Sequence, residues 1–161
     1  MKIMGIDPGS TDSAYVVVNE NYEILAKGKI SNEQLLELIK IPTVHIDEMV
    51  IEMIANMGMG AVGATIFDTC VWIGRFWEAS QSKEKSYIYR REEKINLCGS
   101  MKAKDTNIRQ ALIDRFGVVG TKNNQGFFYG FKADMWAAFA VAVTYLDKKK
   151  EVENETHFCK N

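Results

Sequence analysis

Short apolar runs separated by polar turns occupy the first thirty residues. Residues 3–6 are apolar and end at Asp7, where a proline and a glycine stop the run, since proline cannot donate a ladder hydrogen bond and glycine permits a sharp turn. Residues 14–18 are rich in β-branched and aromatic side chains, and residues 22–30 repeat this strand pattern after a polar turn. The pattern predicts three strands in an antiparallel meander.

A helix and a central strand are predicted next. Ser31 and Gln34 have the spacing of a capping box ahead of an apolar pattern that Pro42 ends. Residues 49–54 are apolar except for Glu52, and such a run is typical of a strand covered on both faces. Buried glutamates are uncommon without a partner, so Glu52 either forms a structural ion pair or belongs to a site.

The second half of the chain is mostly helical by its pattern. The expected elements are a helix over 61–79, a strand over 86–90, a helix from Asp105 to a stop at Gly117, and a last helix from about residue 132 to 143. The helix over 61–79 is apolar on more than one side, so it is either deeply buried or half covered by a second copy of the chain. We expect one domain over residues 1–147 and a polar, frayed tail over 148–161.

Composition narrows the class of protein. The chain has 161 residues, 47% of them hydrophobic, and no apolar run long enough to cross a bilayer. Its first residues lack the sections of a signal peptide and its three cysteines are widely spaced, so we expect an intracellular protein with free thiols and no membrane contact. With two histidines and no Cys-x-x-Cys pair, any metal is expected to have oxygen ligands.

Charge is unevenly distributed along the chain, although the net charge is only -1. Residues 81–110 are locally basic and carry Lys83, Lys85, Arg90, Arg91, Lys94, Lys102, Lys104 and Arg109. Such a stretch is either a solvated face or a surface that binds phosphate groups.

Three acids stand where apolar elements end or begin. Asp7 ends the first strand, Glu52 interrupts the central strand, and Asp134 lies in the first turn of the last helix. Each has an ordinary explanation, respectively a turn, an ion pair and a helix dipole. Converging carboxylates would repel one another unless divalent cations joined them, and oxygen ligands suit Mg²⁺ or Mn²⁺.

The chain resembles the RuvC-type Holliday junction resolvases, especially the short versions carried by bacteriophages. The residues that carry the resemblance are Gly5-Ile6-Asp7-Pro8-Gly9, Val50-Ile51-Glu52, Ala133-Asp134 with the alanine-rich helix, Tyr89-Arg90, and Cys98-Gly99-Ser100 before the basic stretch from Lys102 to Arg109. Their order and spacing extend over residues 2–145.

The resemblance implies an α/β protein of RNase H-like fold, with a five-stranded mixed sheet, three antiparallel strands first, and helices on both faces. It also implies a homodimer that nicks four-way or branched DNA in recombination and repair, with the helix over 61–79 as the interface. For a phage protein, the compartment would be the cytoplasm of the bacterial host.

The resemblance assigns Asp7, Glu52 and Asp134 as the catalytic acids that bind Mg²⁺, with Mn²⁺ as an alternative. Asp7 would bridge two ions held about 4 Å apart, an arrangement that supports in-line attack of water on a phosphodiester. We expect Lys102 and Lys104 to contact the scissile phosphate. The expected contacts along the DNA arms are Lys83, Lys85, Arg90 and Arg91, and Arg109 belongs to the same basic surface.

One departure from the family concerns the start of the last helix, where the family has two metal-site residues three apart. Here only Asp134 is acidic, with Phe131 and Ala137 on either side. Asp105 and Asp12 are candidates for the missing ligand.

Two other functions fit the same residues. One is a junction-binding module that keeps the fold and does not cut. The other is a nucleotide binder, because Asp7-Pro8-Gly9-Ser10-Thr11 also resembles the phosphate loop of actin-like ATPases and sugar kinases. Those proteins need two such domains, and 161 residues contain no visible internal repeat.

Overall fold

A computed structural model of the chain describes residues 1–41, 45–55 and 63–158. Its centre is a five-stranded sheet in the order β3-β2-β1-β4-β5. The strands are β1 (Lys2–Asp7), β2 (Asp12–Asn19), β3 (Ile24–Ser31), β4 (Glu48–Met53) and β5 (Glu84–Tyr89). The first three strands are antiparallel, and β4 and β5 run parallel to β1. The predicted mixed sheet with three leading antiparallel strands is confirmed.

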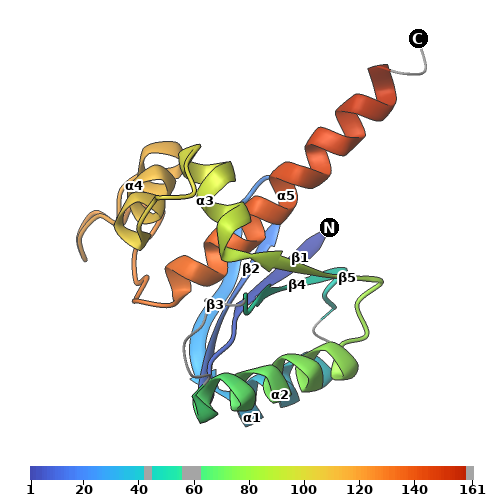
Figure 1. The fold of residues 1–161 in the computed structure, drawn as a ribbon. Helices are drawn as coiled ribbons and strands as arrows, with labels where there is room; N and C mark the ends of the chain where they lie inside the picture. The colour runs from blue at the N-terminus through green and yellow to red at the C-terminus, as the bar shows by residue number, and fades with distance from the viewer. Residues whose placement is uncertain (42–44, 56–62, 159–161) are drawn as a thin grey trace.

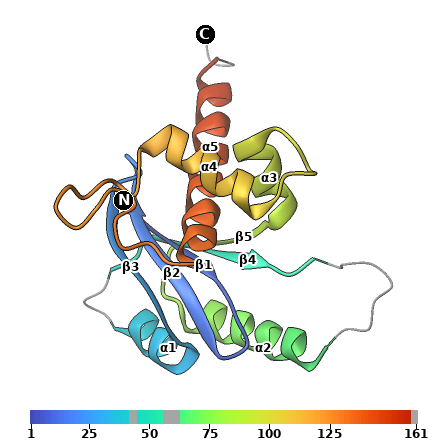
Figure 2. The same cartoon turned by 90° about the vertical axis from the view of Figure 1, so that its left-hand side faces the viewer.

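Helices cover both faces of this sheet (Figure 1). They are α1 (Asn32–Lys40), α2 (Ala64–Ala79), α3 (Arg90–Cys98), α4 (Asp105–Phe116) and α5 (Met135–Phe158). Figure 2 shows α1 and α2 on one side of the sheet and α3, α4 and α5 on the other. The sheet therefore has two cores, one beneath each group of helices.

Strand alternation decides which core each side chain enters, because successive residues of a strand point to opposite faces. On β1, Ile3 packs into the core beneath α5, whereas Met4 and Ile6 pack into the core beneath α1 and α2. Asp7 lies two residues beyond Gly5 and four beyond Ile3, so it emerges on the α5 side of the sheet.

Helix α5 packs closely against β1 at Gly5. A Cβ atom on Gly5 would lie 2.4 Å from the carbonyl oxygen of Ala138 and 2.9 Å from the Cβ of Ala142. Both distances are shorter than van der Waals contact, so only glycine fits between strand and helix. Because α5 begins three residues before Ala138, this contact brings the first turn of α5 to the end of β1.

The capping box at Ser31 and Gln34 is confirmed, since each side chain binds the backbone N–H of the other residue. Helix α3, in contrast, was not predicted from the basic stretch. Its signals are present: Glu92 Oε2 accepts the N–H of Tyr89 at 2.7 Å, and Gly99 ends the helix with a φ of 64°. Glycine is the residue that adopts this left-handed backbone readily.

The last helix is longer than predicted. It begins at Met135, one residue after Asp134, and continues to Phe158. Lys148 bonds Glu92 of α3 at 2.5 Å, and Lys149 contacts Glu48 of β4. The segment from residue 148 was expected to be frayed, but it is helical as far as Phe158, and Lys148 and Lys149 attach its first residues to acids of the domain.

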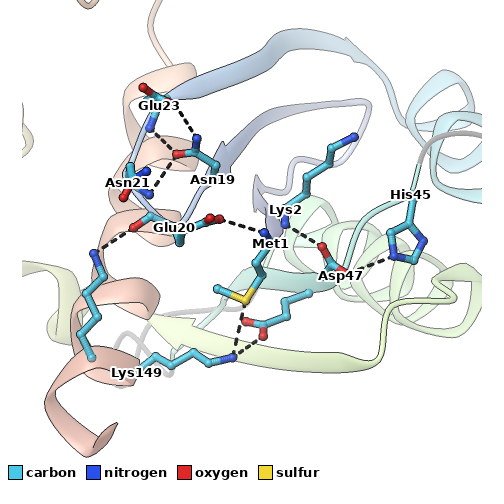
Figure 3. Close-up of polar contacts among 11 residues, drawn as sticks. Met1, Lys2, Asn19, Glu20, Asn21, Glu23, His45, Asp47 and Lys149 are labelled. Atoms are coloured by element: carbon cyan, nitrogen blue, oxygen red, sulfur yellow. Dashed lines mark hydrogen bonds and ion pairs between the residues drawn. The ribbon is translucent and has the colours of Figure 1, made fainter. Parts of the chain in front are cut away.

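A cluster of polar contacts lies at the amino ends of β1 and β4 (Figure 3). The amino group of Met1 donates to Glu20 Oε2 at 2.8 Å, and the N–H of Lys2 donates to Asp47 Oδ2 at 2.8 Å. We call Met1, Glu20, Asp47, Glu48 and Lys149 the amino-end cluster. Every acid in it has a direct cationic or N–H partner.

Two cysteines lie in the described residues, and both Cys70 and Cys98 are free thiols. Across the same residues, no helix combines the length and the apolar character needed to cross a membrane.

Candidate active site

Two acids lie side by side at the carboxyl ends of parallel strands. β1 pairs with β4 in parallel with Ile6 opposite Ile51, so the next residues along each strand, Asp7 and Glu52, are neighbours. Val50 packs beneath α5, and alternation puts Glu52 on that same side of the sheet. Strand geometry alone therefore brings both carboxylates to one place.

The third predicted acid joins them from α5. Asp134 immediately precedes this helix, and its carbonyl oxygen accepts the N–H of Ala138 at 3.0 Å. Asp7, Glu52 and Asp134 all line one open pocket of about 490 Å³. The remaining residues of its lining are Arg90, Asp105, Ile108, Arg109, Ala133, Trp136 and Ala137. The structure thus gathers three acids that are 45 and 82 residues apart in the sequence.

The electrostatics of the pocket are unfavourable to ionised carboxylates. Burial raises the pKa of Asp7 to about 8, and the negative charges of Glu52 and Asp134 add to this effect. Burial also raises the pKa of Glu52, although Arg90 opposes the shift. Both acids are short of positive charge, which is the condition that a divalent cation would relieve.

Two of the three acids pair with different cations of the chain. Lys29 Nζ lies 2.5 Å from Asp134 Oδ2, and Arg90 Nη1 lies 4.0 Å from Glu52 Oε2. Among the residues described, no three acid, histidine or cysteine side chains are close enough together to hold a metal ion. The donor set fits Mg²⁺ or Mn²⁺ in its chemistry, since it consists of carboxylate oxygens with excess negative charge, two of them on partly buried side chains. Asp134 would have to leave Lys29 to join Asp7 and Glu52.

The structure distributes the predicted DNA contacts over different places. Lys102 and Lys104 are exposed between α3 and α4 and do not belong to the pocket lining, where the cations are Arg90 and Arg109 instead. Arg91 is exposed on α3.

Lys83 and Lys85 lie at the start of β5, at the opposite end of the sheet. The N–H of Lys83 bonds the carbonyl of Asp47 at 2.9 Å, and Lys85 Nζ donates to the carbonyl of Trp77 at 2.7 Å. The strand separates these two lysines from Glu52, which is opposite Ile88 near the end of β5.

The two residues that flank Asp134 have different surroundings. Phe131 packs edge-on against Phe128 and Phe139, with ring centroids 5.1 and 5.9 Å apart, so it belongs to an aromatic core. Ala137 lines the pocket and has no ligand atom to offer. Of the candidates for a further acid, Asp105 lines the pocket and Asp12 does not.

Sequence reasoning missed the inward position of Arg90 and the burial of Glu93. Arg90 was expected along the DNA arms, yet its side chain is 28% exposed and Nη1 bonds Glu93 Oε2 at 2.6 Å. The spacing of the two residues, three apart on one helix, was the available signal, but it required α3 to be recognised first.

Comparisons with known proteins agree on the fold. No protein family model matches the chain, and no curated protein matches it in sequence. Thermus thermophilus RuvC is similar in structure, with a TM-score of 0.64, 14% sequence identity, and 94% of this chain and 97% of that one covered. T. thermophilus RuvC in complex with a Holliday junction substrate gives a TM-score of 0.66 at 14% identity over 93% and 96% of the two chains.

Fowlpox virus Holliday junction resolvase is also similar, with a TM-score of 0.54 at 15% identity over 92% of this chain and 99% of that one. The chain thus has the fold of the RuvC and poxvirus resolvase structures over almost the whole length of each. At these identities the comparisons establish the architecture, and the chemistry has to be argued from the site.

Proposed function

We propose that this chain is a divalent-metal-dependent endonuclease that cuts Holliday junctions or other branched DNA. The observation that carries the proposal is the pair of Asp7 and Glu52, two partly buried carboxylates at adjacent strand ends that share a pocket with Asp134. Acids in such a place are costly for folding, and a role in binding cations explains their presence. The shared fold with resolvases of known structure supports the substrate class.

Asp7, Glu52 and Asp134 are the proposed ligands of Mg²⁺, with Mn²⁺ as the alternative. Divalent ions bound there would polarise a phosphodiester and make hydroxide available near neutral pH. The chain's part is to supply ionised oxygen ligands from rigid elements. Two of these ligands come from neighbouring strands and one from the residue directly before the helix that packs on Gly5.

The cations of the pocket have a separate task in this proposal. Arg90 and Arg109 share the pocket lining with the acids, where a guanidinium attracts the DNA backbone and stabilises negative charge that develops on phosphate. Arg109 lies 4.6 Å from the centre of the Trp136 ring, which restricts its side chain. Outside the pocket, the exposed Arg91, Lys102 and Lys104 would bind the flanking backbone.

A homodimer is part of the proposal, because a four-way junction is approximately two-fold symmetric and two sites are needed to nick opposed strands. Helix α2 supports it with an outward apolar face, where Phe67 is 62% and Val71 60% exposed. Phe67→Glu is expected to convert the dimer to a monomer in light scattering. Val152→Glu is the matched control, since Val152 is 60% exposed on α5. Equal behaviour of both variants would contradict the α2 interface.

The decisive test is cleavage of an end-labelled four-way junction beside a linear duplex of matched sequence. Each substrate is incubated with Mg²⁺, with Mn²⁺ and with EDTA, and Asp7→Asn is the control for contaminating nuclease. The proposal expects paired, metal-dependent nicks in the junction that Asp7→Asn does not produce. Cutting of the linear duplex at the same rate would contradict selectivity for branched DNA.

A second candidate is a junction-binding protein of the same fold that does not cut. Two observations favour it: neither Phe131, which is part of an aromatic core, nor Ala137 can supply the family's second metal-site residue, and Asp134 is paired with Lys29. This function predicts tight junction binding in a gel-shift assay without nicks in either metal. The cleavage assay above therefore separates the two candidates directly.

A further inference from the structure

Arg90 occupies an unusual position in the acidic pocket. It is the first residue of α3, directly after β5 ends, and its guanidinium faces three carboxylates. Nη1 lies 2.6 Å from Glu93 Oε2 and 4.0 Å from Glu52 Oε2, and Nη2 lies 2.6 Å from Asp105 Oδ1. One cation therefore serves an acid of the sheet, an acid of α3 and an acid of α4.

Glu93 holds the Arg90 guanidinium through an ion pair within α3. Its side chain is fully buried, one oxygen bonds Arg90, and the other has no hydrogen-bond partner in the described part of the chain. Burial raises the pKa of Glu93, and the charge and hydrogen bond of Arg90 oppose this rise, so the ionised form of Glu93 depends on Arg90. A buried acid with so few partners depends on its single cation, so Arg90 is kept at the edge of the pocket.

We propose that Arg90 is a positioning residue that acts as the internal counter-ion of the site. In the metal-free protein it neutralises Glu52 and Asp105, and a divalent cation has to displace it from Glu52 in order to bind. Glu93 sets how far the guanidinium reaches, because it competes with Glu52 for the same group. The inference rests on the proposed function in one respect, that the pocket binds a divalent cation.

The ordinary alternative is a buried ion pair that only stabilises α3. Such a pair would change the stability of the metal-free and metal-loaded forms equally, so it would leave metal affinity unchanged. A counter-ion that competes with the metal is instead coupled to it, and coupling between two ligands of one site is reciprocal. Metal affinity therefore distinguishes the two readings without any DNA present.

Three variants of the full chain distinguish a counter-ion that competes with the metal from an ion pair that only stabilises α3. Arg90→Met removes the charge and keeps an apolar stem, so Glu52 is free for metal. Glu93→Gln keeps the shape and removes the competing acid, so Arg90 is drawn more strongly to Glu52. Arg109→Met is the matched control, because Arg109 lines the same pocket and lies over Trp136 instead of reaching Glu52.

The experiment is titration of each variant with Mn²⁺ at one pH and one salt concentration, by calorimetry and by electron paramagnetic resonance of free Mn²⁺. We expect Arg90→Met to bind Mn²⁺ about five- to tenfold more tightly than the parent chain, within the usual range of coupling between sites. Glu93→Gln should bind about threefold more weakly, and Arg109→Met should stay within about twofold, the size expected of a more distant charge.

Opposite signs for Arg90→Met and Glu93→Gln support the counter-ion, because general damage to the fold would weaken Mn²⁺ binding in both. Unchanged affinity in both variants, or an effect of Arg109→Met as large as that of Arg90→Met, would overturn it. If Arg90→Met does not fold, Arg90→Lys keeps the charge but cannot bridge Glu93 and Asp105, and tighter Mn²⁺ binding by this variant is the expected result. Unchanged affinity of Arg90→Lys would count against the inference.

The outcome is separable from that of the proposed function. If the parent chain nicks junctions while Arg90→Met binds Mn²⁺ like the parent, only the counter-ion is wrong. If the parent neither binds Mn²⁺ nor cuts, the proposed nuclease function is wrong, and the counter-ion is overturned with it.

Discussion

Glu48 and Glu52 invite comparison, because they lie four residues apart on the same strand and on the same face of the sheet. Glu48 is 5% exposed and directly contacts Lys149 in the amino-end cluster. The Glu52 side chain is 18% exposed, and its cation, Arg90, is 4.0 Å away and shared with two other acids. By side-chain exposure Glu48 is the more deeply buried of the two, at 7% against 18%, and it is also the one with a close cation of its own.

The difference separates an acid with a structural partner from the acids that we propose to be functional. At the amino ends of β1 and β4, each acid of the cluster has a cation or an N–H group within the chain on at least one oxygen, although Glu48 Oε2 is buried without a hydrogen-bond partner among the described residues. At the carboxyl ends, Asp7 and Glu52 have raised pKa values because they are buried and lack such partners. A shortage of internal partners, more than burial itself, leaves an acid available to an external cation.

The largest expected effect comes from Glu52→Gln, which removes a proposed metal ligand. Nicking of the four-way junction in Mg²⁺ should fall about a thousandfold or more, since a metal ligand contributes several kcal/mol to the barrier. Junction binding in a gel-shift assay without metal should be unchanged or slightly tighter, because a negative charge is lost. A variant that still cuts at a tenth of the parent rate would exclude Glu52 from the ligand set.

Glu48→Gln tests the other half of the comparison. Loss of its charge leaves the partly buried Lys149 without its closest partner, which should reduce the free energy of unfolding by about 2 kcal/mol. In a chain of this size, that corresponds to a fall in melting temperature of about 5 °C. Nicking per folded molecule should stay at the parent level. Loss of nicking without loss of stability would show that the two ends of β4 are not separate in role.

The pH dependence of stability follows from the raised pKa values. The pKa of Asp7 is near 4 in the unfolded chain and about 8 in the folded one, so its stabilising contribution is complete below pH 4 and is lost as pH rises toward 8. Glu52 shifts in the same direction. The metal-free protein should therefore melt several degrees lower at pH 8 than at pH 5, and Mn²⁺ should reverse the loss because it favours the ionised acids.

Glu52→Gln provides the control for this pH profile. In calorimetric scans without metal, the variant should lose less stability between pH 5 and pH 8 than the parent and gain less from Mn²⁺. Asp47 and Asp147, whose pKa values are lowered by their donors, act below this window and do not obscure it. A parent profile that is flat from pH 5 to pH 8 would contradict the electrostatic description of the pocket.

The smallest effects are expected from the outer lysines. Lys102→Ala and Lys104→Ala should each weaken junction binding about threefold and reduce the slope of affinity against salt by about one. Lys83→Ala is the comparison at the opposite end of the sheet, where the backbone of Lys83 bonds Asp47, and it should have a smaller effect on both quantities. Fluorescence anisotropy at several salt concentrations measures all three. Equal effects would mean that DNA extends over both ends of the sheet.

The sequence was sufficient to predict most of the sheet and the positions of three acids. Residues 3–6 and 49–54 are apolar runs with an acid at or near their ends, and parallel pairing of two such strands makes Asp7 and Glu52 neighbours. Asp134 followed from the alanine-rich helix behind it. These inferences succeed because strand alternation and helix boundaries are local properties of the chain.

The cations of the site could not be predicted in the same way. Counting charges over residues 81–110 gives a basic stretch, but it does not say which side chains turn inward. Arg90 turns toward the pocket because α3 begins there and Glu93 is buried one turn later, whereas Lys83 and Lys85 fall at the far end of β5. The length of α5 was missed for a related reason, since Lys149 finds Glu48 some hundred residues away.

The contact at Gly5 has a consequence for how accurately the site is aligned. Asp134 precedes Ala138 by four residues, about 6 Å along the helix, and Asp7 follows Gly5 by two, about 7 Å along the strand. The Gly5 contact therefore fixes the strand and the helix to each other within a short distance of both acids. A methyl group added at Gly5 would force the helix away from the strand. Asp134 and Asp7 would then move relative to each other, although neither residue had been changed.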